Sequence, residues 1–96
     1  TVAPEVVEGW IHQSYTLHEL QRTPEAWSSL LAVANRFPEE SIIAYNLACY
    51  ACQMGDLAVA RDWLQRAVRL RSKGEIRTLA LHDPDLAPLR DFLKGL

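Results

Sequence analysis

The feature of this chain that most constrains its fold is an internal register of 34 residues. When the sequence is laid on itself at that offset, Ala26 falls on Ala60 and Leu30 falls on Leu64, and residue class agrees at many other positions. A third, shorter copy continues the register from about residue 75. A period of this length is typical of stacked supersecondary units, because one unit cannot bury its apolar face alone. The period therefore predicts a repeat protein, with an unrelated helical bundle of the same helices as the alternative.

The apolar residues of each unit have helical spacing. They recur three and four positions apart, and no segment alternates apolar and polar residues as a half-buried strand does. An all-α chain is therefore expected. Thr23 and Asp56 are suited to cap helices, Pro38 to stop one, and Gly55 to make a tight turn. The expected helices run from Pro4 to about Leu20, from Thr23 to Pro38, over about residues 40–53 and 56–71, around residues 76–81, and beyond the "HDPD" turn.

Each expected helix has a stripe that should face a neighbouring helix. The third helix is apolar nearly all round, which is typical of a helix buried on several sides. Small residues at Ser14, Ala26, Ala48 and Ala60 should let helices approach closely. The stripes of the other helices consist of Val6, Trp10, Ser14 and Leu17; of Ala26, Leu30, Val33 and Phe37; of Leu57, Ala60, Leu64, Ala67 and Val68; and of Leu86, Leu89 and Leu93.

Over about residues 5–82 the chain resembles the tetratricopeptide repeat (TPR) family, whose units pair two helices with the pattern W-x2-L-G-x2-Y, then A-x3-F, then a proline. The residues on this pattern are Trp10, Ala26, Leu30 and Pro38 in the first repeat and Leu47, Ala60, Leu64 and Ala67 in the second. The resemblance implies one domain over residues 1–96, an α-solenoid of antiparallel helix–turn–helix repeats. Repeat 1 would cover about residues 5–38 and repeat 2 about residues 39–72. A truncated third repeat and capping helices would cover about residues 75–94.

In this family the first helix of each pair lines a concave groove, and the resemblance places the binding surface of this chain there. Helical spacing independently puts the same positions on one face. The predicted groove is centred on Tyr15 and Tyr45, because aromatic side chains bury a large area at low entropic cost. Alternatively, the capping helices fill the groove and make it core. The predicted groove residues are Ile11, Tyr15, His18, Ile42, Tyr45, Cys49, Cys52, Gln53 and Leu79.

The resemblance implies a non-catalytic scaffold that binds a peptide or helix of another protein, with self-association into a homo-oligomer as an alternative. Charge offers a second alternative. Residues 1–56 hold seven acidic and two basic side chains, and residues 57–96 hold five acidic and eight basic ones. The basic cluster of Arg61, Arg66, Arg69, Arg71, Lys73 and Arg77 could meet an acidic ligand or a nucleic acid. Cations near a helix end also stabilise its dipole, and the aromatic interleaving that base stacking needs is missing, which disfavours nucleic acid.

Cys49 and Cys52 are the residues that most suggest chemistry. A redox pair of this spacing stands at the start of a helix after a strand, whereas these cysteines lie in mid-helix. A structural zinc ion needs four ligands, and His12, His18 and His82 have no matching spacing. The cysteines are therefore predicted to be small packing residues. We expect no metal, no cofactor and no enzymatic activity.

The location of the protein is only weakly indicated. The longest apolar runs are a few residues, far below the ~20 that cross a bilayer, so no contact with a membrane is expected. Two cysteines are fewer than small secreted domains normally use, which favours a reducing compartment and hence the cytoplasm. The chain begins with Thr1, so a targeting segment could precede it.

Overall fold

A computed structural model describes residues 7–95 and shows an all-α fold, as predicted. These residues form six α-helices and one 3₁₀-helix, and the described part of the chain contains no strand. Pro4 and Val6, which were expected in the first helix, lie outside the described residues. The elements are α1 (Val7–Glu19), α2 (Thr23–Ala34), α3 (Ser41–Gln53), α4 (Leu57–Leu70), α5 (Lys73–Leu81), η1 (Pro84–Leu89) and α6 (Arg90–Lys94).

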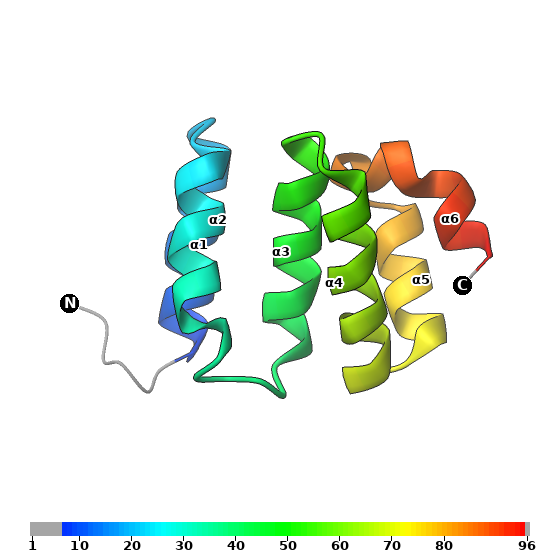
Figure 1. The fold of residues 1–96 in the computed structure, drawn as a ribbon, viewed down its shortest axis with the longest axis horizontal. Helices are drawn as coiled ribbons and strands as arrows, with labels where there is room; N and C mark the ends of the chain where they lie inside the picture. The colour runs from blue at the N-terminus through cyan, green and yellow to red at the C-terminus, as the bar shows by residue number, and fades with distance from the viewer. Residues whose placement is uncertain (1–6, 96) are drawn as a thin grey trace.

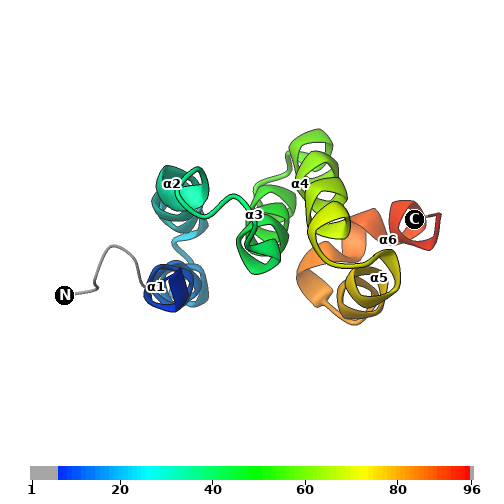
Figure 2. The same ribbon diagram turned by 90° about the horizontal axis from the view of Figure 1, so that it is seen from below.

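The helices form an elongated stack in which α1 to α5 run alternately up and down (Figure 1). Seen from below, α2 and α4 lie on one side, α1, η1 and α5 lie on the other, and α3 lies between them (Figure 2). Helix α3 packs against α1, α2, α4 and η1. This central position confirms that the helix with apolar residues all round is buried on several sides. No described helix combines the length and the apolar character needed to span a membrane.

The 34-residue register recurs in the three-dimensional structure. Helix α1 ends at Glu19 and α3 ends 34 residues later at Gln53, while the starts of α2 and α4 are separated by the same number of residues. The turns repeat as well, because Gln21 (φ 63°) and Gly55 (φ 86°) both have left-handed backbone conformations and are also 34 positions apart. Glycine adopts this conformation without strain, whereas the Cβ of Gln21 makes it sterically unfavourable. The two hairpins therefore have first helices of equal length and the same turn conformation, while α4 is two residues longer than α2.

Two predicted helix boundaries differ from the structure. Helix α2 ends at Ala34, before Pro38, and residues 35–37 form a turn. The residue before a proline is disfavoured in helical conformation, which keeps Phe37 out of the helix. Thr23 is the first residue of α2 rather than its cap, and its hydroxyl is hydrogen-bonded to the His18 ring. Asp56 caps α4 as predicted, because its side chain accepts a hydrogen bond from the Val59 N–H.

The C-terminal segment starts earlier than expected, and its last helix is divided into η1 and α6. Helix α5 begins at Lys73 because the Ser72 hydroxyl accepts the Glu75 N–H and caps it. Asp83 accepts the Asp85 N–H in the same way and starts η1. The predicted stripe of this segment is confirmed, since all three of its leucines are buried: Leu86, Leu89 and Leu93.

The core agrees with the predicted stripes. The four small residues expected at close helix approaches, Ser14, Ala26, Ala48 and Ala60, are each 0% exposed. Phe37, at the end of the α2 stripe, is only partly buried because the helix has ended before it. Leu30, Val33, Leu64 and Ala67 of these stripes are also buried, whereas the remaining described members are only partly buried: Trp10, Leu17, Leu57 and Val68.

Candidate functional site

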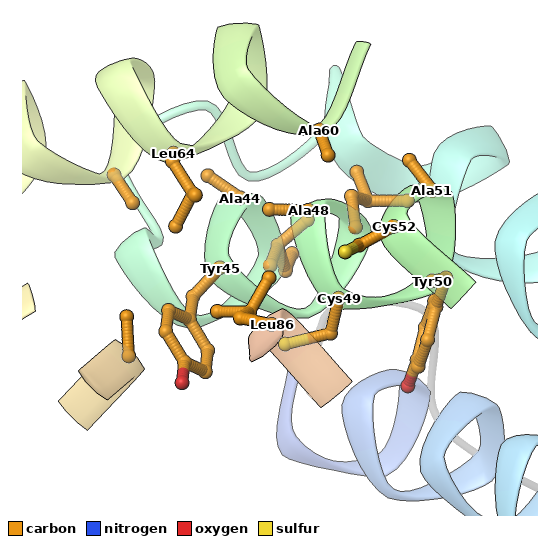
Figure 3. Packing of buried hydrophobic residues seen from close by; sticks show 14 of the residues in the cluster. Ala44, Tyr45, Ala48, Cys49, Tyr50, Ala51, Cys52, Ala60, Leu64 and Leu86 are labelled. Carbon is orange, nitrogen blue, oxygen red and sulfur yellow. The ribbon is translucent and has the colours of Figure 1, made fainter. Parts of the chain in front are cut away.

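The face predicted to be a binding groove is divided into a covered part and an open part. Element η1 lies against α3 and covers Tyr45, Cys49 and Cys52, which are 9%, 4% and 4% exposed. Leu86 of η1 lies beside Tyr45 and Cys49 (Figure 3). At these three residues the capping segment fills the predicted groove, which was the alternative expectation from the sequence. They belong to the core and not to an accessible surface.

Polar contacts fix η1 to α3. The Tyr45 hydroxyl donates a hydrogen bond of 2.8 Å to Asp83 Oδ2, and the Cys49 thiol lies 3.6 Å from the same oxygen. The Gln53 amide donates a hydrogen bond of 2.9 Å to the Asp85 carbonyl oxygen. Three of the five predicted groove residues of α3 thus act as hydrogen-bond donors to the chain's own capping segment.

His18 joins the same contact region from α1. Its Nε2 lies 2.8 Å from Asp85 Oδ2, and its Nδ1 lies 2.8 Å from the Thr23 hydroxyl. A carboxylate can only accept a hydrogen bond, so Nε2 carries the proton and, in the neutral ring, Nδ1 accepts from Thr23. The ring also lies 5.1 Å from the Tyr50 ring, centroid to centroid. Because both ring nitrogens are engaged, His18 connects α1, α2 and η1 rather than facing open solvent.

The cysteine environment opposes thiolate chemistry. Burial raises the pKa of the Cys49 thiol, and the negative charges of Asp83 and Asp85 raise it further. Burial also raises the pKa of Cys52, with the same two carboxylates contributing. Both thiols are therefore neutral near pH 7, whereas nucleophilic attack and metal binding use the thiolate. Neither cysteine is in a disulfide, and no group of three or more His, Cys, Asp or Glu side chains in residues 7–95 is arranged to hold a metal ion.

A buried pair of hydroxyls joins α1 and α3. Ser14 Oγ and Tyr50 Oη are 3.1 Å apart, and Figure 3 shows Tyr50 directed from α3 toward α1. Ser14 also donates a hydrogen bond of 2.9 Å to the Ile11 carbonyl oxygen, so its one proton is used there and its oxygen accepts from Tyr50. Burial raises the pKa of Tyr50 to about 12. The small residue at position 14 thus makes room for Tyr50 and supplies its hydrogen-bond partner.

The open part of the predicted groove is a cleft of about 930 Å³ between α1 and α3. Ile11 and Ile42 give it apolar walls, and Tyr15 is 49% exposed beside them. We call this region the α1/α3 cleft. Its lining consists of Val7, Glu8, Gly9, Ile11, His12, Tyr15, Glu40, Ile42 and Asn46.

The charges of the α1/α3 cleft are acidic. Glu8 and Glu40 are exposed, and neither forms an ion pair with another residue that the structure describes. No lysine or arginine is among the lining residues. A hydrogen bond with Glu19 and the negative charge of Glu19 raise the pKa of the Tyr15 hydroxyl, and the charges of Asp85 and Asp83 contribute. Helical spacing placed Tyr15, Ile11 and Ile42 on this face, but the importance of Glu40 and Asn46 emerges only when α1 and α3 lie side by side.

Leu79, the last predicted groove residue, lies elsewhere. It is 47% exposed and lines a separate hollow of about 390 Å³ with Arg71, Gly74, Glu75 and Thr78. The nine predicted residues therefore do not share one surface, because η1 covers the middle of the face and leaves α1/α3 and α5 on either side of it.

Part of the basic cluster stabilises the fold. The Arg66 guanidinium lies 5.3 Å from the centre of the Trp63 ring and donates a long hydrogen bond of 3.4 Å to the Pro38 carbonyl oxygen. Arg71 forms an ion pair of 3.0 Å with Glu75. Trp63 also makes an edge-to-face contact with Trp27, their ring centres 6.5 Å apart. Two of the six cations thus have partners within the chain, which supports the interpretation of this cluster as a stabilising face.

Comparison of the chain with protein-family models, with curated proteins and with solved structures gave no match.

Proposed function

We propose that this chain is a non-catalytic protein-binding module built from TPR-like repeats, and that it holds a peptide or helical segment of another protein in the α1/α3 cleft. Repeat 1 covers about residues 5–38, repeat 2 about residues 39–72, and a truncated third repeat with its cap about residues 75–94. The observation that carries the proposal is the apolar cleft between the first helices of the two repeats, with Tyr15 half exposed beside it.

The repeat assignment is supported by backbone geometry as well as by sequence pattern. The bounds of α1 and α3 and the starts of α2 and α4 are 34 residues apart, and so are the left-handed turn residues Gln21 and Gly55. A helical bundle without internal repetition has no reason to place two left-handed residues at equivalent points of two hairpins.

The size and chemistry of the cleft suit a peptide segment with apolar side chains. Its volume of about 930 Å³ is near the top of the range of about 300–1,000 Å³ that is usual for ligand pockets. Ile11 and Ile42 can bury apolar side chains, while Tyr15 offers an aromatic ring with a polar end. The Asn46 amide can donate to and accept from a peptide backbone.

Three polar side chains that could otherwise act in catalysis are engaged in holding the capping segment. Tyr45 and Cys49 contact Asp83, and His18 bonds Asp85. A general base or nucleophile needs a free approach to substrate, and none of these three groups has one while η1 is in place. This supports a binding role over an enzymatic one.

The proposal can be tested with peptides selected for binding. Random twelve-residue peptides displayed on phage are panned against the immobilised protein, and the binding of enriched peptides is measured by fluorescence polarisation. Tyr15→Ala should weaken binding about fivefold or more, because truncation of an aromatic anchor costs about 1 kcal/mol or more. Leu31→Ala on α2, where the side chain is 39% exposed, is the control and should bind as the wild type does.

The thermal unfolding of both variants should match that of the wild type, since both side chains are partly exposed. Two results would contradict the proposal. Either panning enriches no peptide, or the enriched peptides bind the folded Tyr15→Ala variant as tightly as they bind the wild type.

A further inference from the structure

Carboxylates stand at one end of the α1/α3 cleft and just beyond the other, and apolar side chains lie between them. Glu8 is in the first turn of α1 and Glu40 directly precedes α3, and both helices begin at the same end of the molecule (Figure 1). Beyond the other end, one turn past Tyr15 on α1, Glu19 is exposed and raises the pKa of the Tyr15 hydroxyl. The cleft therefore combines an apolar centre with two carboxylates at one end and a further carboxylate just beyond the other.

The negative charge at the first end is only partly neutralised. The N-termini of α1 and α3 each contribute the equivalent of about half a positive elementary charge. Two carboxylates, Glu8 and Glu40, leave roughly one net negative charge there, and neither has a cationic partner among residues 7–95. A low-dielectric hollow with walls of one charge sign concentrates ions of the opposite sign.

We infer that the segment bound in the α1/α3 cleft is a cationic apolar one, with lysine or arginine on both sides of a short apolar run. This inference rests on the proposed function and specifies its partner. Glu8 and Glu19 are eleven residues apart on one helix, which corresponds to about 16 Å. An extended chain covers that distance in about five residues. The expected ligand is thus about four or five apolar residues with a cation at either end.

The same charges exclude other ligands from this cleft. An acidic peptide or a nucleic acid would bring like charges together at both ends without a lysine or arginine in the lining to offset them. The residues of the basic cluster lie on α4, on α5 or between these two helices, and none of them lines the cleft.

The experiment uses the peptides enriched on the wild-type protein and single charge reversals. Enriched sequences should contain lysine or arginine on both sides of an apolar run. Glu8→Lys and Glu40→Lys should each weaken their binding roughly tenfold at low ionic strength, and this effect should shrink in 0.5 M salt because exposed charges are screened. The matched control is Asp62→Lys, an exposed carboxylate on α4, which should leave affinity unchanged.

The outcomes separate this inference from the proposed function. If enriched peptides lack flanking cations and both Glu variants bind them normally while Tyr15→Ala does not, the charge inference fails and the binding module stands. If no peptide depends on Tyr15, the proposed function fails as well. Concentration-dependent self-association of the protein, measured by sedimentation and abolished by Glu8→Lys, would identify a second copy as the occupant and overturn the inferred partner.

Discussion

Removal of the Asp83 carboxylate should detach the capping segment from α3. The Asp83→Ala variant loses an acceptor for the Tyr45 hydroxyl at 2.8 Å and the N-terminal cap of η1, in which Asp83 accepts the Asp85 N–H at 3.0 Å. It also loses the weaker contact with the Cys49 thiol at 3.6 Å. A single carboxylate thus connects three groups, two of which are on α3.

The magnitude follows from the burial of Tyr45. A buried hydroxyl left without a partner costs about 1–3 kcal/mol, and a lost helix cap costs about 1 kcal/mol. Asp83→Ala should therefore lower the free energy of unfolding by about 2–4 kcal/mol. Tyr45→Phe should lower the free energy of unfolding by only about 1 kcal/mol, because it removes the hydroxyl instead of leaving it buried without a partner. The Asp83 carboxylate that loses its donor is partly exposed and can bind water instead. In the double variant no hydroxyl is left unpaired, so the coupling energy should be about 1–2 kcal/mol.

The measurement is a double-mutant cycle by urea unfolding, followed by the circular dichroism of the helices. Asp62→Ala, which removes an exposed carboxylate on α4, is the control and should change stability by less than about 0.5 kcal/mol. A coupling energy below about 0.3 kcal/mol between positions 45 and 83 would refute the view that this hydrogen bond holds the capping segment.

Two further predictions concern stability. Burial raises the pKa of Cys49 and Cys52, so above about pH 8.5 the unfolded chain loses thiol protons that the native chain keeps. The free energy of unfolding, measured in urea from pH 7 to 10, should therefore fall with pH by at most about 1.4 kcal/mol per pH unit for each thiol. It should fall less steeply in the Cys49→Ala variant. A pH-independent stability would contradict this. Gln21→Gly should raise the free energy of unfolding by about 0.5–1 kcal/mol, because glycine adopts the left-handed conformation of position 21 without strain. Gly55→Ala should lower it by about 1 kcal/mol, although nothing lies within 4 Å of the added Cβ. Equal stability of the wild type and both variants would exclude backbone strain at these positions.

The helices and their buried faces could be predicted because they depend on local spacing. Leu30 and Leu64 are buried where the three- and four-residue periodicity places them, and Asp56 caps α4 through a contact only three residues away. The start of α2 was misassigned because it depends on a contact with another helix. The Thr23 hydroxyl bonds His18 of the preceding helix, a partner that no rule for the start of α2 includes.

The candidate site was only partly predictable for a related reason. Helical phase places Tyr15 and Tyr45 on equivalent faces, yet one is half exposed and the other is covered. The difference is Asp83, which lies 38 residues beyond Tyr45 in sequence and binds its hydroxyl. Periodicity predicts that Leu86 is buried. It does not predict which helix Leu86 will contact, because this depends on the direction that the chain takes after α5.

The edge-to-face contact between Trp27 and Trp63 gives the protein an intrinsic spectroscopic reporter. The rings belong to α2 and α4, the second helices of the two hairpins, and their planes are inclined at 83°. Two indoles this close couple their electronic transitions and produce an exciton band in the far-ultraviolet circular dichroism, distinct from the signal of helical backbone. Loss of this band while helicity persists would mark separation of the hairpins before they unwind, and no label would be required to see it.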